Sequence, residues 1–265
     1  MNRVFTKHVP VICLLILSHF TSCKKGERAA EIDEKIIPPV VQPSAKILIP
    51  IQLGTGKSGM QISYTADLSI AKIEYGNGTS MLMTYNAAGQ PLTLQRYKGA
   101  ALISSTDYDF NEKGQVIQGS MAVVKGNNYT ETGYYTLSYN SLNQPSEINY
   151  YDMNDRLTDK LKKSYNEAGN LIGEKGNTEE AKLDYDTKNG LFKHAGYLWL
   201  LTLEKEDNLF LSARNNLQQC NFPLKPEKNQ TFSYSYNSDN YPETISSTVN
   251  GINNTLKVIY KQVKN

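Results

Sequence analysis

A short pattern that returns along the chain limits the fold more than any other feature of this 265-residue sequence. The stretches that share it begin at Tyr85, Phe110, Tyr139, Tyr165, Tyr185 and Tyr236. In each, Asn or Asp follows the aromatic residue directly, and Gly or Asn stands four places after it. Asn and Asp favour the first position of a type I turn, whereas Gly and Asn readily accept a left-handed backbone. A type I turn followed by a left-handed residue makes a three-residue hairpin loop with a bulge, so each stretch predicts a β-hairpin.

The residues around these turns predict strands with one buried face. The position before the aromatic residue is polar in every copy, and the position two before it is apolar except where it is Lys163. This alternation places the aromatic residue on the buried face. We therefore expect an all-β fold, a long antiparallel meander of repeated hairpins that forms one twisted or curled sheet over residues 59–265. Turns at the opposite ends are expected near 76–78, 125–127 and 175–177. A weaker copy begins at Tyr64 and has Leu68 at the left-handed position.

The interval between Tyr185 and Tyr236 is longer than the others and has a different composition. Leucines crowd together there with few β-branched residues, at positions 198, 200, 201, 203, 209 and 211. This predicts a short helical insertion near 193–222 that interrupts the meander and covers the apolar side of the sheet. A lid over a pocket is the functional alternative.

The N-terminus has the pattern of an export signal. Arg3 and Lys7 precede an apolar segment, residues 9–20, that is too short to span a bilayer well. The following Thr-Ser-Cys resembles the lipobox of bacterial lipoproteins, which implies a signal peptide over residues 1–22 and lipidation of Cys23. An ordinary secretory signal with an incidental cysteine is the alternative. Residues 23–58 contain several prolines and predict an extended tether between the lipid and the sheet.

The composition excludes several classes of function. Removal of the signal peptide would take away two basic residues and no acidic ones, which leaves a nearly neutral chain and no basis for nucleic-acid binding. Cys220 would be the only thiol left, so no intrachain disulfide is expected. His194 would be the only histidine left, which excludes a multi-histidine metal site. We expect no metal and no cofactor.

Several short motifs suggest chemistry, but each has a simpler interpretation. The GTGKSG stretch at 54–59 ends like a nucleotide-binding loop but lacks the first glycine of that motif. Asp107 and Asp109 alternate on a predicted strand, and Glu179 adjoins Glu180, as paired carboxylates of a glycosidase could. The YDMNDR stretch at 151–156 resembles a calcium loop without its spacing or final glutamate. Solvated sheet residues and turns explain all of these at least as well.

Aromatic residues are the best candidates for ligand contacts. The adjacent pairs Tyr134/Tyr135 and Tyr150/Tyr151 would place one ring on each face of a strand, and the outward ring could stack on a sugar or a partner protein. Trp199 lies in an apolar run and is a further candidate. Tyrosines that pair across strands and a tryptophan in the core are the alternatives.

The repeated Y-[ND]-x-x-[GN] pattern resembles the YD repeat of Rhs-type proteins, whose repeats build β-sheet shells. Together with the lipobox, the tether and the late insertion, it also resembles envelope lipoproteins of the DUF4595 type, whose function is unknown. The resemblance implies no catalytic residues. It implies a lipid-anchored protein of the bacterial cell envelope, in the outer membrane of a Gram-negative cell. We expect this protein to be non-catalytic and its sheet surface to bind an envelope protein or a glycan. A glycan-active enzyme and a structural spacer remain alternatives.

Overall fold

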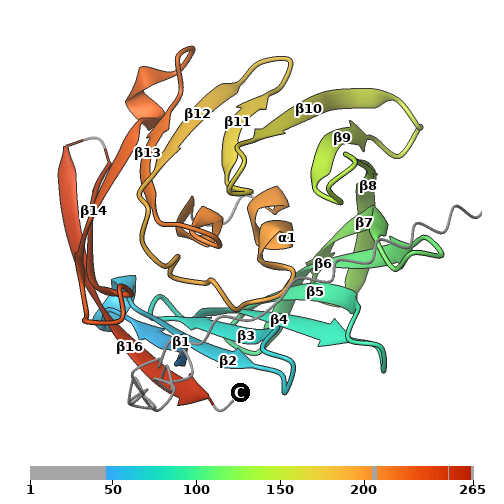
Figure 1. Ribbon diagram of the computed structural model, residues 1–265. Helices are drawn as coiled ribbons and strands as arrows, with labels where there is room; N and C mark the ends of the chain where they lie inside the picture. Colours follow the sequence, from blue (N-terminus) through green and yellow to red (C-terminus); the bar gives the residue numbers. More distant parts are fainter. Residues whose placement is uncertain (1–45, 205–207, 250, 264–265) are drawn as a thin grey trace, which may run out of the picture. The chain divides into compact units, whose positions relative to one another are not determined.

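A computed structural model describes residues 46–204, 208–249 and 251–263, and within them sixteen strands form a closed antiparallel barrel. Each strand pairs with its neighbours in sequence, and β1 closes the ring against β16, as Figure 1 shows. The strands are β1 (Ile47–Leu53), β2 (Met60–Tyr64), β3 (Ile70–Tyr75), β4 (Thr79–Tyr85), β5 (Pro91–Lys98), β6 (Ala101–Phe110), β7 (Val116–Lys125), β8 (Asn128–Tyr139), β9 (Pro145–Tyr151), β10 (Leu157–Tyr165), β11 (Leu171–Lys175), β12 (Glu180–Tyr185), β13 (Leu217–Asn221), β14 (Gln230–Tyr236), β15 (Pro242–Val249) and β16 (Ile252–Val263). The predicted all-β meander is confirmed, and the sheet is closed.

The repeated pattern forms the predicted hairpin turn in each copy except the one at Tyr185, where Asn189 does not have positive φ. In the first copy, the Asn86 N–H donates to Gln90 O and the Gly89 N–H donates to Asn86 O, while the Asn86 side chain accepts from the N–H groups of Ala88 and Gln90. The fourth residue after the aromatic has positive φ at Gly89, Gly114, Asn143, Gly169 and Asn240, and Leu68 also has positive φ in the weaker copy. The strand register shifts at every repeat aromatic, which is the expected bulge. We call the end of the barrel that these turns form the turn rim, and the opposite end the far rim.

The repeat tyrosine joins neighbouring hairpins where their strands separate. The ladder between β7 and β8 ends at Gln118, two residues short of Val116, and the Tyr139 hydroxyl donates to Val116 O at 2.7 Å. Tyr165 reaches Pro145 O in the same way, also at 2.7 Å. The strand ladder has already ended at this first residue of the return strand, so its N–H has no carbonyl partner on the neighbouring strand. Proline therefore fits this position, and it recurs there as Pro91, Pro145 and Pro242.

The two ends of the barrel build one further unit of the same kind. Pro50 pairs with Tyr260, and the register shifts between Pro50 and Gln52 as it does at the other bulges. The Tyr64 hydroxyl donates to Pro50 O at 2.7 Å. The prediction that the tether runs to residue 58 is therefore wrong from Ile47 onward, because Pro50 occupies the one strand position that tolerates proline. The signal peptide, Cys23 and the tether up to residue 45 lie outside the described residues.

The predicted insertion occupies a hairpin loop and lies inside the barrel. The Asp186 N–H donates to Asn216 O and its carboxylate accepts from the Asn216 N–H, so the closing bonds of a repeat turn are kept while residues 187–215 replace the short loop. We call the described residues of this segment, 187–204 and 208–215, the plug. It contains α1 (Leu198–Leu203) and the 3-10 helix η2 (Asn208–Leu211), and Figure 1 shows α1 within the ring of strands. The helical insertion was predicted to reach residue 222, but Leu217–Asn221 is strand β13, because the repeat hairpin resumes at Asn216.

The barrel is apolar inside and mainly polar outside, although its strands also carry exposed apolar residues such as Ile117, Ile172 and Ile259. Inward residues of the wall pack with the plug into one core that includes Ile73, Leu94, Ile148, Leu200 and Phe210. Between these inward positions the strands carry polar outward residues, listed for β10 as Lys160, Lys162 and Ser164, and for β15 as Thr244, Ser246 and Thr248. Hydroxyls also bond across the outer wall, as in the pair Ser235 and Thr244 at 2.7 Å. No helix in the described ranges is long and apolar enough to cross a membrane.

Candidate functional site

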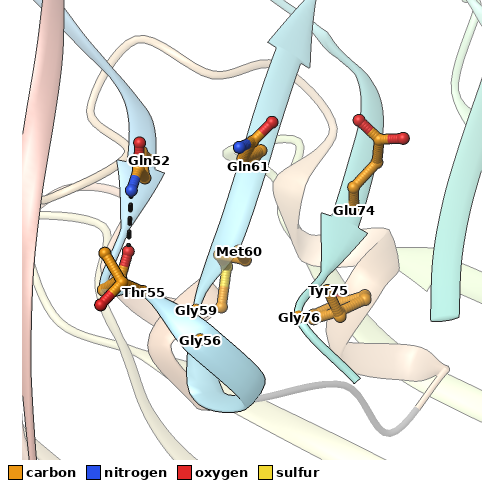
Figure 2. Close-up of a pocket in the computed structure, with 10 residues that line it drawn as sticks. Gln52, Thr55, Gly56, Gly59, Met60, Gln61, Glu74, Tyr75 and Gly76 are labelled. Atoms are coloured by element: carbon orange, nitrogen blue, oxygen red, sulfur yellow. Dashed lines mark hydrogen bonds between the residues drawn. The ribbon is translucent and has the colours of Figure 1, made fainter. Parts of the chain in front are cut away.

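A glycine-rich groove lies at the far rim, where residues of β1, β2, β3 and the turns that join them line it (Figure 2). The GTGKSG stretch forms a turn with the 3-10 helix η1 (Gly56–Ser58) and then continues as a strand, so the strand–loop–helix of a nucleotide-binding loop does not form. The turn lies against Gly76, where a Cβ atom would stand 1.7 Å from Gly56 O. Backbone and the polar side chains of Gln52, Gln61 and Glu74 line most of this groove. Met60 and Tyr75 also line it, and its one charged side chain is Glu74, so no basic group is available there for a phosphate.

A second cavity, of about 450 Å³, opens at the turn rim between the repeat turns and the plug. Its wall on the plug side is aromatic and apolar, and its wall on the barrel side consists of turn residues and the ends of β9 to β11. We call it the plug cavity. The residues that line it include Asp67, Asn143, Gln144, Lys163, Tyr165, Asn170, Lys193, His194, Tyr197, Trp199, Phe210 and Arg214.

The plug holds its aromatic residues in place through contacts with the barrel wall. Trp199 is half-buried and meets Tyr139 edge-on, with ring centroids 6.4 Å apart and planes at 85°. Tyr197 precedes α1 with φ of 54°, a left-handed conformation that is unusual for a bulky residue, and its ring lies 6.4 Å from that of Tyr85. A backbone bridge between Gly196 and Ser69 fixes this segment to the turn rim. The aromatic wall is therefore formed before any ligand arrives.

Amide side chains connect the repeat turns and form the polar wall of the cavity. The Asn170 side chain donates to Asn215 Oδ1 at 2.8 Å and accepts from the Asn215 N–H at 3.1 Å, which joins a turn to the plug. Gln144 lies beside the next turn, with its Nε2 3.4 Å from the point where a Cβ on Gly169 would stand. At Gln90, Gln115, Gln144 and Asn170, the residue after the left-handed position thus reaches a neighbouring turn or the plug. The sequence indicated only a hairpin here, whereas these turns also line the cavity.

Basic side chains outnumber acidic ones in the lining. Lys163 points inward from β10, its side chain is only 4% exposed, and it forms an ion pair with Glu174 on β11. Glu174 does not line the cavity, but Lys163 does. Lys193 and Arg214 stand exposed at the mouth, and Asp67 is the one carboxylate among the lining residues. The sequence contained a signal for this charge, because Lys163 is the exception to the apolar position of the repeat.

His194 lies in the cavity wall as a hydrogen-bonded residue. Its Nε2 is 2.8 Å from the Tyr241 hydroxyl, and burial together with neighbouring Lys193 lowers its pKa. Asp107 lines a different hollow on the outer wall, beside Tyr129 and Tyr134. His194 therefore does not share a site with Asp107, one of the carboxylates considered for glycoside hydrolysis.

The candidate tyrosines form cross-strand pairs on both faces of the wall. Tyr134 stacks on Tyr151 outside the barrel, with centroids 4.9 Å apart and planes at 14°. Tyr135 pairs with Tyr150 inside, at 5.5 Å, and Tyr135 is fully buried. Of the residues named for ligand contacts, Trp199 alone lines the plug cavity. A ligand role for these residues stays a prediction.

The remaining motifs have structural roles. Asp152 begins another hairpin turn, between β9 and β10, in which Asp155 has φ of 58° and accepts from the Tyr134 hydroxyl. Glu179 pairs with Lys225 and Lys228, which hold its pKa down at about 2. Cys220 is buried, and burial raises its pKa to about 12, so the thiol is unreactive. The described residues contain no group of three or more possible metal ligands.

A buried polar cluster that the sequence did not reveal anchors the plug near the far rim. Arg96 donates to Glu204 O at 2.7 Å, and Thr106 donates to the Glu204 carboxylate at 3.0 Å. The Tyr135 hydroxyl lies 3.4 Å from the same carboxylate, and burial raises its pKa far above the usual value. These bonds attach the end of α1 to β5, β6 and β8. The cluster explains why Tyr135 points inward, and its role is to hold the plug.

Comparisons with known proteins assign no family to the chain. No protein-family model matches the chain, and no curated protein matches its sequence. A porin-like protein from Bacteroides uniformis is 14% identical, over 83% of this chain and 97% of that one, with a TM-score of 0.39. A porin-like protein from Bacteroides vulgatus is 11% identical, over 81% and 99% of the two chains, with a TM-score of 0.42. The Photorhabdus luminescens Tc holotoxin pore is 13% identical over 75% of this chain but only 9% of that one, with a TM-score of 0.29. No family assignment follows.

The resemblance to the DUF4595 type therefore stays a hypothesis. The chain is a sixteen-strand β-barrel that resembles porin-like proteins and the Tc toxin, and these likenesses are too distant to carry a function. Function has to be argued from the plug cavity itself.

Proposed function

We propose that this protein is a non-catalytic, lipid-anchored module of the bacterial cell envelope that binds a glycan in the plug cavity. The observation that carries the proposal is the arrangement of that cavity, in which the half-buried Trp199 ring faces amides and charged groups of the turn rim. Aromatic surface with a few convergent polar groups is typical of small-molecule sites. The lipobox-like sequence at Cys23 supports the anchor and the envelope location.

The polarity of the wall supports a barrel that stands in water beside the membrane. Strands that span a membrane as a barrel carry apolar residues outward and polar residues inward. Here charged and hydroxyl side chains face outward, and the plug fills an apolar interior with Leu200, Leu201 and Phe210 at 0–1% exposure. This arrangement favours a binding module over a pore.

The charges in the cavity support a non-catalytic role. Glycoside hydrolysis commonly uses two carboxylates that flank the bond to be broken. Asp67 is the one carboxylate among the lining residues, and His194 is already bonded to Tyr241. The structure offers no comparable argument for a purely structural spacer, because a spacer has no use for a preformed aromatic cavity.

Glycan binding can be tested with the mature domain on a glycan array, followed by titration of the hits. Trp199 is the only tryptophan in the sequence, so its fluorescence reports directly on the cavity. Trp199→Ala should abolish binding, whereas Tyr129→Ala, which removes an exposed ring on the outer wall, should leave it unchanged. Binding that survives Trp199→Ala and is lost with Tyr129→Ala would place the site elsewhere. Release of the protein from membranes by Cys23→Ala tests the anchor separately.

A further inference from the structure

The two departures from the repeat meet in one place. Only the Tyr185 copy has its short loop replaced by the plug, and only the Tyr165 copy has a charged residue, Lys163, two positions before its aromatic residue. Lys163 and plug residues line the same cavity. If this copy followed the pattern of the others, the side chain at position 163 would be apolar and this part of the cavity lining would be uncharged.

A buried lysine is costly unless its charge has partners. Lys163 donates one hydrogen bond to the carboxylate of Glu174, a residue that does not line the cavity. An ammonium group has three donors, so the side that faces the cavity is suited to an acceptor on a ligand. A carboxylate gives the strongest bond of this kind, because a hydrogen bond between two charged groups is roughly twice as strong as a neutral one.

The mouth of the cavity has the same sign of charge. Arg214 is exposed, lies beside the Gly169 turn and forms no ion pair with the described residues. Lys193 is exposed and donates to Asn189 Oδ1, an uncharged partner. Asp67 is the one acidic side chain that opposes them in the lining. Positive charge at the entrance attracts anions and raises the rate at which they associate.

We infer that the plug cavity is specific for an acidic saccharide, one whose ring lies on Trp199 and whose carboxylate reaches Lys163. The inference rests on the proposed function and names the class of glycan. The ligand must have a ring, because the wall at Trp199 is aromatic, and a negative charge, because Lys163 lies in the lining and Lys193 and Arg214 lie at the mouth. The bond to Lys163 is made away from solvent, so it contributes more to selectivity than the exposed contact with Arg214.

The test uses Trp199 fluorescence and matched pairs of ligands. Trisaccharides of galacturonic acid, glucuronic acid and N-acetylneuraminic acid are titrated beside their methyl esters, which keep the ring and lose the charge. We expect at least one acid to bind about tenfold to a hundredfold more tightly than its ester, the range that one charged hydrogen bond gives. Added salt should weaken binding of the acid and leave binding of the ester unchanged.

Variants identify the groups responsible. Lys163→Met restores the apolar pattern, and the double variant Lys163→Met with Glu174→Gln avoids a stranded carboxylate if the single variant does not fold. Either variant should lower the affinity for the acid to the affinity for its ester. Arg214→Gln should weaken binding of the acid severalfold. Lys113→Gln, which also removes one positive charge but at an exposed turn outside the cavity, should have no effect.

Each outcome decides one question. If esters bind as tightly as acids, the cavity takes neutral sugars, so the inference fails while the proposed function stands. If neither acids nor esters bind and the glycan array is empty, both fail. If an acid binds selectively but the Lys163 variants retain the preference, the charge that selects it lies elsewhere and the inference is overturned.

Discussion

The hydroxyl of the repeat tyrosine gives a sharp test of how the barrel holds its hairpins together. Tyr139 and Tyr185 occupy the same position in two copies, and burial raises the pKa of both. The Tyr139 hydroxyl donates to Val116 O, where Val116 is 1% exposed and the strand ladder has already ended. The Tyr185 hydroxyl is buried and has no hydrogen-bond partner among the described residues. The same substitution at the two sites should therefore have opposite results.

Tyr139→Phe keeps the ring against Trp199 and removes only the donor, so Val116 O is left buried without a partner. An unsatisfied buried group of this kind costs about 1–3 kcal/mol. In a domain of this size each kcal/mol lowers Tm by about 2–4 °C, which predicts a fall of roughly 2–12 °C. Tyr185→Phe removes a hydroxyl whose burial is unfavourable because it forms no hydrogen bond, so the free energy of unfolding should stay unchanged or rise.

The assay is urea unfolding of the mature domain, followed by circular dichroism, with thermal scans as a second measure. Equal losses for Tyr139→Phe and Tyr185→Phe would refute the reasoning, because the ring and its packing, rather than the hydroxyl bond, would then carry the effect. An unchanged slope of free energy against urea in both variants confirms that the denatured state is the same.

Two further predictions concern the plug and the acid limit of the fold. Leu200→Ala removes a fully buried side chain of α1 and should cost about 2–5 kcal/mol, whereas Leu142→Ala at an exposed turn should cost almost nothing; equal urea midpoints would show that the plug does not pack as described. Two lysines lower the pKa of Glu179 from 4.5 to about 2, so its contribution to stability is present above pH 4.5 and is lost as the pH falls toward 2. Glu179→Gln should flatten the loss of stability between pH 4.5 and 2 without large effect on the slope near neutrality, and an unchanged acid profile would contradict the assignment.

The hairpins could be predicted from the sequence because the physics that specifies them is local. Asn86 and Gly89 fix a turn within a few residues, so the pattern needs no knowledge of the rest of the chain. Leu68 shows the limit of this reasoning, since it takes the left-handed conformation that the sequence made doubtful. There the bonds of the neighbouring strands outweigh the preference of the side chain.

Closure of the barrel and the cavity could not be predicted in this way. Closure depends on a pairing between β1 and β16 that no local pattern encodes, and Pro50 argued for a tether until its partner Tyr260 was known. The cavity depends on the plug folding inward and bringing residues such as Trp199 and Arg214 beside turns that lie far away in the sequence. Lys163, a charged residue at an apolar position of the repeat, was the one feature of the sequence that indicated a site here. Its role becomes clear only from the plug residues that line the same cavity.

The seam between β1 and β16 joins strands from the two ends of the described chain, and the plug lies between β12 and β13, inside the ring that this seam completes. Until the last strand pairs with the first, the sheet keeps two free edges, and free edges invite pairing with other chains. A chain that lost its final strand would therefore keep its local hairpins while exposing two strand edges and a gap in the wall around the plug.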